Sequence, residues 1–268
     1  DFAGILISSY SEVGGDIINN GQITSDGVEV SVSASAMVSG NAPLDIEEGT
    51  GIGIMVNGES DITGSLINNS DIDAVSSGIL VGSTSTVAGN ITNGTNGDIT
   101  TGDYGIVVHQ TSTVEGDIVN QGNINGSDMG IVVWTNSQVD GDIINSGVIT
   151  AEGGEEHGAV GIDVHTSTIS GEINNSGIIT ADDYSLHIGA KATVTGHVDN
   201  SGTLTGGLWL YGTDAIDLDN SGVLDLVDTI DNYISGDFDQ DGDGEFAFEL
   251  DLATSYEADE WILTVHGE

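Results

Sequence analysis

The chain has 268 residues, of which 41 are glycine, one is proline, none is cysteine and 5% are aromatic. Its 44 aspartates and glutamates stand against one lysine, Lys191, and no arginine, so the formal net charge is −43. Such a polyanion repels nucleic acid and anionic membrane surfaces, which excludes proteins that bind either one through basic residues. Without cysteine the chain forms neither disulfides nor thiolate metal sites.

The acidity also indicates where the protein works. A chain of this charge repels itself and is tolerable only where cations are plentiful, as in sea water or in the millimolar calcium outside a cell. No apolar stretch approaches the length of a membrane helix, no signal peptide is visible, and the chain starts at Asp1 as a processed product would. We therefore expect an extracellular protein with no membrane insertion in this segment.

A repeated unit runs along almost the whole chain. It reads G-I-x-V, a polar corner, then V-x-G-D-I-x-N-x-G-x-I, and a period of this length means stacked supersecondary units. A first copy spans Gly4 to Asn19, a degenerate copy covers Val28 to Gly49, shorter copies begin near Leu186 and Leu208, and the best copies begin at Gly53, Gly78, Gly105, Gly130 and Gly161. We expect one domain over 1–268, with degenerate rungs in 1–50, regular rungs in 51–207, and irregular rungs and closing strands in 208–268.

The spacing inside each unit predicts the fold. Apolar residues recur every second position, as in strands, and nothing recurs at helical spacing. In one copy we expect Ile106, Val108, Val114, Ile118 and Ile124 to point inward, because alternate residues of a strand share a face. Parallel crossovers are right-handed in nearly all sheets. The prediction is an all-β chain, a right-handed, single-stranded parallel β-helix (β-solenoid) of about ten rungs.

One polar column is expected to be architectural. Stacked amides donate and accept along the axis of a solenoid and so satisfy polar groups at a tight turn. The same place in the unit is occupied by Asn19, Asn68, Asn93, Asn120, Asn145, Asn175, Asn200 and Asn220.

These residues resemble a known class of repeat. The unit from Val139 to Thr150 looks like the passenger repeats of bacterial autotransporters, and Ile234 to Gln240, Phe246 to Leu252 and Trp261 to Gly267 resemble the segment that closes such passengers. The resemblance implies a passenger displayed at a bacterial cell surface or released from it. It carries over no catalytic residue, because this repeat class serves adhesins, proteases and passive stalks alike.

Two outward columns are apolar over the first rungs, which on so acidic a chain suggests an assembly interface. We expect self-association through Leu6, Met55, Leu80, Val107 and Val132 of one strand and Ile18, Ile67, Val119 and Ile144 of another. The alternative is simple β-propensity on half-exposed strands. The ends of the chain offer a second route to self-association. Strand-like sequence lies near Asp1 and over Glu260 to Val265, so two open strand edges could stack end to end into a filament. The alternative is that caps which covered these edges have been removed.

The acidic residues suggest cation sites. Hard cations take several oxygens, and alternate residues of a tight turn supply them, so we expect calcium as a candidate cofactor at Asp237, Asp239, Asp241, Asp243 and Glu245. The alternative is a solvated acidic turn, since the twelfth position, Phe248, does not complete an EF-hand. Asp117, Asp142 and Glu172 share one column, where like charges would repel each other unless cations lie between them.

Ligand contact is predicted at a corner column that holds His109, Trp134 and His165. An exposed tryptophan there could stack on a sugar, and the alternative is a corner decoration without a ligand.

Lyases of acidic sugars need arginine or lysine, and no pair of carboxylates stands out for hydrolysis, so we do not expect an enzyme. The sequence favours a cation-dependent structural or adhesive protein, a surface stalk or a self-assembling fibre subunit. A glycan-binding adhesin and a polysaccharide hydrolase are the alternatives.

Overall fold

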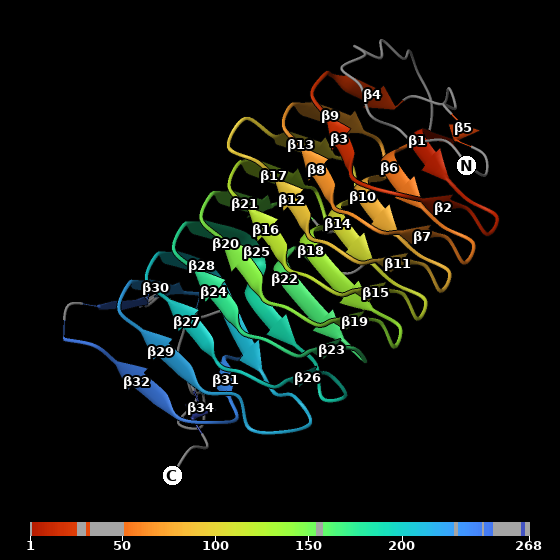
Figure 1. Cartoon of the computed structure of the whole chain (residues 1–268). Helices are drawn as coiled ribbons and strands as arrows, with labels where there is room; N and C mark the ends of the chain where they lie inside the picture. Colours follow the sequence, from red (N-terminus) through yellow and green to blue (C-terminus); the bar gives the residue numbers. More distant parts are fainter. Residues whose placement is uncertain are drawn as a thin grey trace.

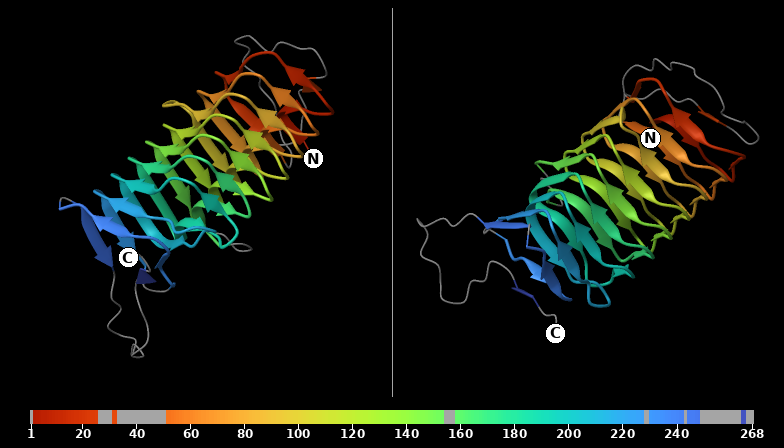
Figure 2. Two further views of the ribbon diagram at one scale, coloured as in Figure 1. Left: turned by 60° about the horizontal axis from the view of Figure 1, so that its bottom comes forward. Right: turned by 60° about the vertical axis from the view of Figure 1, so that its left-hand side comes forward.

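The computed structural model describes residues 2–25, 31–32, 51–153, 158–227, 230–242, 244–248 and 264–265. Every regular element among them is a β-strand, and every strand pairing is parallel. The strands form three sheets that follow one another around an axis and run along its length (Figure 1). Two further views show the same stack of turns from other sides (Figure 2). The predicted parallel β-solenoid is confirmed.

Sheet A contains two strands from most turns. Its 18 strands are β1 Phe2–Ile7, β4 Ile23–Ser25, β5 Ser31–Val32, β6 Gly51–Val56, β9 Asp71–Ala74, β10 Ser77–Val81, β13 Asp98–Thr101, β14 Tyr104–Val108, β17 Asn123–Gly126, β18 Met129–Trp134, β21 Val148–Ala151, β22 Val160–His165, β25 Ile178–Ile188, β28 Thr203–Leu210, β30 Val223–Leu226, β31 Tyr233–Ile234, β33 Glu245–Phe248 and β34 Thr264–Val265.

Sheet C contributes one strand to each of the nine described rungs, and sheet B contributes one strand to each of the first seven. The seven strands of sheet B are β2 Glu12–Val13, β7 Asp61–Ile62, β11 Thr86–Val87, β15 Thr113–Val114, β19 Gln138–Val139, β23 Thr168–Ile169 and β26 Thr193–Val194. The nine strands of sheet C are β3 Ile17–Asn19, β8 Leu66–Asn68, β12 Ile91–Asn93, β16 Ile118–Asn120, β20 Ile143–Asn145, β24 Ile173–Asn175, β27 Val198–Asn200, β29 Leu218–Asn220 and β32 Phe238–Gln240. The described residues therefore form nine rungs, close to the expected ten.

The order of the repeats predicted that the second, degenerate copy would form a rung between the first and the third. The strand pairing shows that it does not. In sheet C, β3 pairs directly with β8, with Ile17 opposite Leu66. Strand β5, which comes from the degenerate copy, instead pairs with the outer edge of β1, with Leu6 opposite Ser31. The rest of that copy lies outside the described residues.

Inward side chains form one continuous apolar core. The five residues expected to point inward, Ile106, Val108, Val114, Ile118 and Ile124, are at most 1% exposed. Each such side chain contributes roughly 1.5–3 kcal/mol when its neighbours cover it. Because every turn repeats the same inward positions in register, branched aliphatics stack on branched aliphatics along the whole axis.

The glycine that opens the long strand of sheet A lies too close to its neighbours for a side chain. At Gly105, a Cβ atom would overlap the Cγ2 methyl of Ile124 and would lie 2.5 Å from the carbonyl oxygen of Gly130 on the next rung. Lack of space therefore favours glycine at this position in Gly4, Gly53, Gly78, Gly105, Gly130 and Gly161, although Ser185 takes it on the rung after Gly161.

Two rows of polar side chains run inside the coil. In the first, Nδ2 of Asn120 donates to Oδ1 of Asn145 at 2.8 Å, and the same contact joins all eight predicted asparagines before ending on Gln240. In the second, the backbone N–H of Ser85 donates to the hydroxyl of Ser112 at 3.2 Å, and equivalent bonds join Ser11, Ser60, Ser85, Ser112, Ser137 and Ser167. The serine row ends at Ser167, since Ala192 takes the same position on the next rung, and in the sequence it shows only as a serine in each of the six corners before it.

The outer edges of sheet A are partly paired at both ends of the stack. Strand β5 covers two residues of β1, and β34 covers two residues of β31, with Ile234 opposite Val265. Of the predicted terminal strand Glu260 to Val265, only Thr264 and Val265 are described, and most of Phe246 to Leu252 and Trp261 to Gly267 lies outside the described residues.

Candidate functional site

The outer face of sheet A carries one side chain from each rung in a straight column. In order, the paired residues are Leu6, Met55, Leu80, Val107, Val132, Asp163, His187 and Trp209. The column is the one expected from the repeat, and it changes from apolar to polar at Asp163.

Side chains of the same chain cover the apolar part of this column. A second apolar cluster, separate from the core, contains Leu80, Val107, Met129, Val132 and Val160, with Ile52, Met55, Tyr104, Trp134 and Tyr184 packed against it. Val132 is fully buried. No partner is needed to keep Leu80, Val107 and Val132 from water, so this column owes its apolar character to packing within the chain. Of the predicted interface residues in it, only Leu6 and Met55 are partly exposed.

A pocket of about 460 Å³ lies where the column turns polar. We call it the Trp134 pocket, and it is lined by Met129, Trp134, Thr135, Val160, Asp163, His165, Thr166, Tyr184 and His187. Trp134 and His165 were predicted as ligand contacts, and they pair on adjacent rungs. His109 occupies the preceding rung of the same corner column but does not line the pocket.

A buried carboxylate orients the polar groups of the pocket. Asp163 is only 4% exposed, its Oδ2 accepts the indole N–H of Trp134, and its Oδ1 contacts Nδ1 of His187. Because a carboxylate only accepts, Nδ1 of His187 is the protonated nitrogen, which leaves Nε2 available to a ligand. Asp163 thus fixes the positions of an indole and an imidazole at once.

Aromatic rings form the walls. Tyr104 packs edge-on against Trp134 with ring centroids 5.6 Å apart, and His187 lies 5.6 Å from Tyr184 and 6.4 Å from the parallel ring of His165. Desolvation, followed by the charges of Asp231 and Asp183, raises the pKa of Tyr184, so its phenol keeps its proton as a donor. The pocket therefore offers ring faces and fixed polar groups, the combination that holds small ligands in defined orientations.

Several pocket residues escaped the sequence analysis. Asp163 and His187 carried a signal, because they interrupt an otherwise apolar column. Tyr184 carried none, since β25 shifts its register on both sides of this residue and the repeat alone does not place it.

The outer face of sheet C carries a second column, which stays at the surface. It runs through Ile18, Ile67, Thr92, Val119, Ile144, Asn174, Asp199, Asp219 and Asp239. Ile18 is 41% exposed, and Ile67, Val119 and Ile144 are half-buried. The predicted interface residues of this column are thus accessible, and assembly through them stays a prediction.

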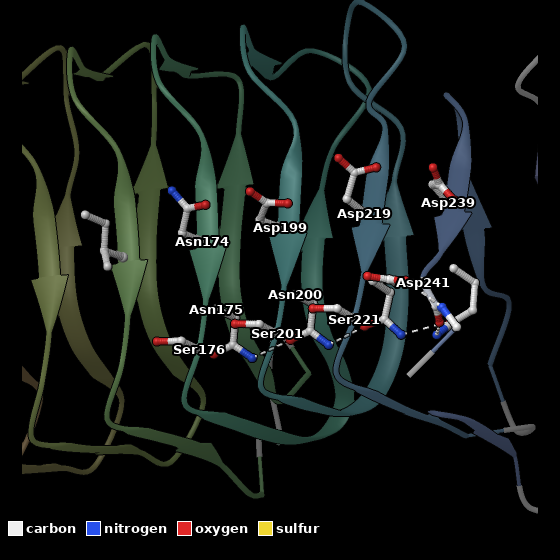
Figure 3. A pocket seen from close by; sticks show the side chains of 14 residues that line it. Asn174, Asn175, Ser176, Asp199, Asn200, Ser201, Asp219, Ser221, Asp239 and Asp241 are labelled. Atoms are coloured by element: carbon white, nitrogen blue, oxygen red, sulfur yellow. Dashed lines mark hydrogen bonds between the residues drawn. The ribbon is translucent and has the colours of Figure 1, made fainter. Parts of the chain in front are cut away.

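The acidic part of the sheet C column borders a shallow depression of about 630 Å³. Figure 3 shows Asn174, Asp199, Asp219 and Asp239 in one row on successive strands, with the buried amide row running beside them. Rungs are about 4.8 Å apart, so this row concentrates negative charge at the C-terminal end of the stack.

The described residues of the predicted calcium loop do not surround a common point. Asp239 lies within β32, whereas Asp237 and Asp241 precede and follow this three-residue strand. Asp241 Oδ1 accepts the backbone N–H of Gly242 at 2.7 Å. Glu245 begins β33, and Asp243 lies outside the described residues. Among the described residues, this stretch contains no group of three ligand atoms within 4.8 Å of one another.

The carboxylate column at the turn before sheet C has a structural role that the sequence analysis missed. The backbone N–H of Asp142 donates to Oδ1 of Asp117 at 2.9 Å, and that of Glu172 donates to Oδ1 of Asp142 at 2.8 Å. The bonds from Ser65 to Asp16 and from Asp237 to Asp217 are equivalent. Backbone donors therefore face one oxygen of each of these aspartates, which offsets the repulsion expected between them.

No protein family, curated protein or solved structure matches this chain. Within the part of the chain that the structure describes, no helix is long and apolar enough to cross a membrane.

Proposed function

We propose that this chain is an extracellular structural β-solenoid, a rigid and cation-dependent stalk that holds an adhesive region away from a bacterial surface. The observation that carries the proposal is the unbroken amide row from Asn19 to Gln240, which keeps nine rungs in one register. Eight steps between rungs give an axial length of roughly 38 Å. The repeat's resemblance to autotransporter passengers supports the same reading.

The charges on the first and last described rungs favour a stalk over direct end-to-end stacking of these rungs. Such stacking would continue each column, so Asp237 of one copy would lie next to Asp16 of another, and Asp239 next to the exposed apolar side chain of Ile18. Strands β5 and β34 also occupy part of the sheet A edges. Like charges at this spacing oppose contact unless cations intervene.

Rigidity can be measured directly because the chain has no cysteine. Asn69 and Ser221 are exposed and follow amide-row residues that are six rungs apart, so spin labels on Asn69→Cys and Ser221→Cys should lie roughly 29 Å apart plus the label length. We expect one narrow distance distribution in calcium, and a broader one in chelator at low ionic strength, where the carboxylates repel each other without screening. A broad distribution in calcium, no change in chelator, or filaments at low protein concentration would contradict the cation-dependent stalk.

Location requires a separate test. Antibodies raised against the folded chain should label intact cells of the source organism, and surface proteolysis should remove the signal. Labelling that appears only after the cells are permeabilised would overturn an extracellular role, whatever the rigidity of the chain.

A glycan-binding role is the second candidate, and the Trp134 pocket supports it. Sugars stack their C–H faces on aromatic rings and bond through hydroxyls, and the pocket supplies Trp134 with Tyr184 and His187 beside it. Both oxygens of Asp163 are engaged by Trp134 and His187, which favours binding over hydrolysis of the sugar. With no arginine in the chain, a neutral oligosaccharide fits better than an acidic one.

Neutral oligosaccharides should bind the monomeric chain and change its tryptophan fluorescence. Trp134→Ala should weaken binding about 2- to 13-fold, since an aromatic contact is worth roughly 0.5–1.5 kcal/mol. Tyr10→Ala is the matched control, because Tyr10 is a 75% exposed aromatic residue far along the stack. Equal affinity of the two variants would rule the pocket out.

A further inference from the structure

His197 stands where the aspartate column at the turn before sheet C is interrupted. Up to Glu172, a short side chain of this column accepts the backbone N–H of the next rung through an oxygen, and the pattern resumes between Asp217 and Asp237. The acceptors before Glu172 are Asp16, Ser65, Asn90, Asp117 and Asp142. Between these stretches the column holds Glu172 and His197, whose longer side chains face each other, with Oε1 of Glu172 3.6 Å from Nδ1 of His197. These two side chains are therefore not committed to the backbone contacts of their neighbours.

The other ring nitrogen of His197 faces the acidic row of sheet C. Nε2 lies 3.3 Å from Oδ2 of Asp199 on β27 and 3.8 Å from Oδ2 of Asp219 on β29. Figure 3 shows the carboxylates of these two aspartates next to each other on adjacent strands. One imidazole is thus enclosed by three carboxylates that come from three successive rungs.

We propose that His197, Asp199 and Asp219 bind a first-row transition-metal dication such as Zn²⁺ through Nε2 and two carboxylate oxygens. Glu172 would then accept a hydrogen bond from the Nδ1–H of His197. This site is independent of the proposed stalk and glycan functions. It is also separate from the predicted calcium loop, whose described residues do not converge.

The distances fit this class of ion. Tetrahedral Zn²⁺ with bonds of about 2.0–2.2 Å places its ligand atoms about 3.4 Å apart, near the 3.3 and 3.8 Å found around Nε2. Ligand atoms of Glu172, His197 and Asp199 all lie within 4.8 Å of one another. The carboxylate of Asp219 does not belong to this group and has to rotate toward Asp199 to reach the same ion. The side chains are between 36% and 53% exposed, so they can rotate to close around the ion and leave one position to water.

The chemistry selects against calcium and magnesium here. Both prefer oxygen ligands alone, whereas imidazole suits Zn²⁺, Ni²⁺ and Cu²⁺. A ligating histidine normally donates its other N–H to a carboxylate, which fixes the ring and raises its basicity. Glu172 is placed for that role, so it acts as a positioning residue and not as a ligand.

Zn²⁺ titrated calorimetrically into the whole chain in excess Mg²⁺ tests the proposal, because Mg²⁺ occupies the many surface carboxylates and leaves imidazole free. We expect one saturable equivalent of Zn²⁺. His197→Gln should abolish it, Asp199→Asn and Asp219→Asn should weaken it at least tenfold, and Glu172→Gln should weaken it about 10–100-fold.

Controls separate this site from diffuse binding. His109→Gln makes the same change on another face and should leave Zn²⁺ affinity unchanged. In the wild-type chain, Co²⁺ should broaden the side-chain NMR signals of His197 before those of the other histidines, a readout that does not depend on any variant folding. The proposal is overturned if no 1:1 site survives in Mg²⁺, if His197→Gln binds like the wild type, or if Co²⁺ broadens another histidine first.

Discussion

Asparagine shows how one residue type takes two roles in neighbouring positions. Asn145 is buried, accepts a hydrogen bond from Asn120 and donates one to Asn175. Asn174, which follows Ile173 on the next strand, lies on the outer face. The buried amide donates through Nδ2 and accepts through Oδ1, so one side chain makes both bonds of the row. The outer amide has no such constraint.

Asn145→Asp should therefore destabilise the chain by about 3 kcal/mol or more at neutral pH. The carboxylate still accepts from Nδ2 of Asn120, but it cannot donate to Oδ1 of Asn175, so two acceptor oxygens face each other and a charge is buried without a cationic partner. Asn174→Asp is the matched control and should cost under about 1 kcal/mol. Urea unfolding at pH 7 measures both. Similar midpoints for the two variants would mean that the buried row contributes little.

His109 makes the fold sensitive to acid. Its ring packs over Gly82 of the preceding rung, and burial lowers the pKa of the imidazole below 6.5. The unfolded state then binds the proton more readily, so the free energy of unfolding contributed by this group falls as the pH drops below about 6.5. His109→Gln should lose less stability than the wild type between pH 7.5 and 5.5 in parallel melts. Parallel losses would contradict this.

At the scale of the element, glycines set how closely the strands of a turn approach each other. The long and the short strand of sheet A meet at Gly105, where Ile124 occupies the space that a side chain would need. Elsewhere, a glycine such as Gly14 has open space around the place of a Cβ atom. A side chain would therefore clash at Gly105, whereas it would meet open space at Gly14.

Gly105→Ala should lower the free energy of unfolding by about 1–3 kcal/mol through overpacking. Gly14→Ala should be neutral or should stabilise slightly, because it restricts the unfolded chain without a clash. Thermal melts of the two variants beside the wild type make the comparison. If both behave alike, close approach is not the reason for the glycine column.

At the scale of the molecule, the apolar core must stabilise the fold against the mutual repulsion that comes with a formal net charge of −43. Aspartates gather on the outer row of sheet C, where successive rungs place them about 4.8 Å apart. Parallel stacking makes this repulsion unavoidable, since equal positions of the repeat become direct neighbours.

Added salt should therefore raise the melting temperature, most steeply between 10 and 150 mM ionic strength, where the Debye length falls from about 30 to 8 Å. Calcium or magnesium at equal ionic strength should raise it further, because divalent ions bind between carboxylates. Calorimetric melts across both series give the result. A melting temperature independent of salt would show that the surface charge is fully compensated within the fold.

The sequence by itself determined the repeat architecture. Isoleucine and valine at every second position, asparagine at one place in each unit, and glycine before the long strand are local rules, and stacking equal units in register turns them into a core and an amide row. The outward columns followed from the same period, because alternate residues of a strand point to opposite faces.

Only the tertiary structure decided what the outward residues do. Three arrangements depend on side chains from different rungs that meet in space. Val132 is covered by its neighbours, and Asp163 bonds to Trp134 and His187. His197 is surrounded by Glu172, Asp199 and Asp219. The placement of β5 against β1 likewise breaks the order of the repeats. A period states which residues share a face, but contacts across rungs depend on side-chain length, register shifts and corner geometry, which differ from one copy to the next.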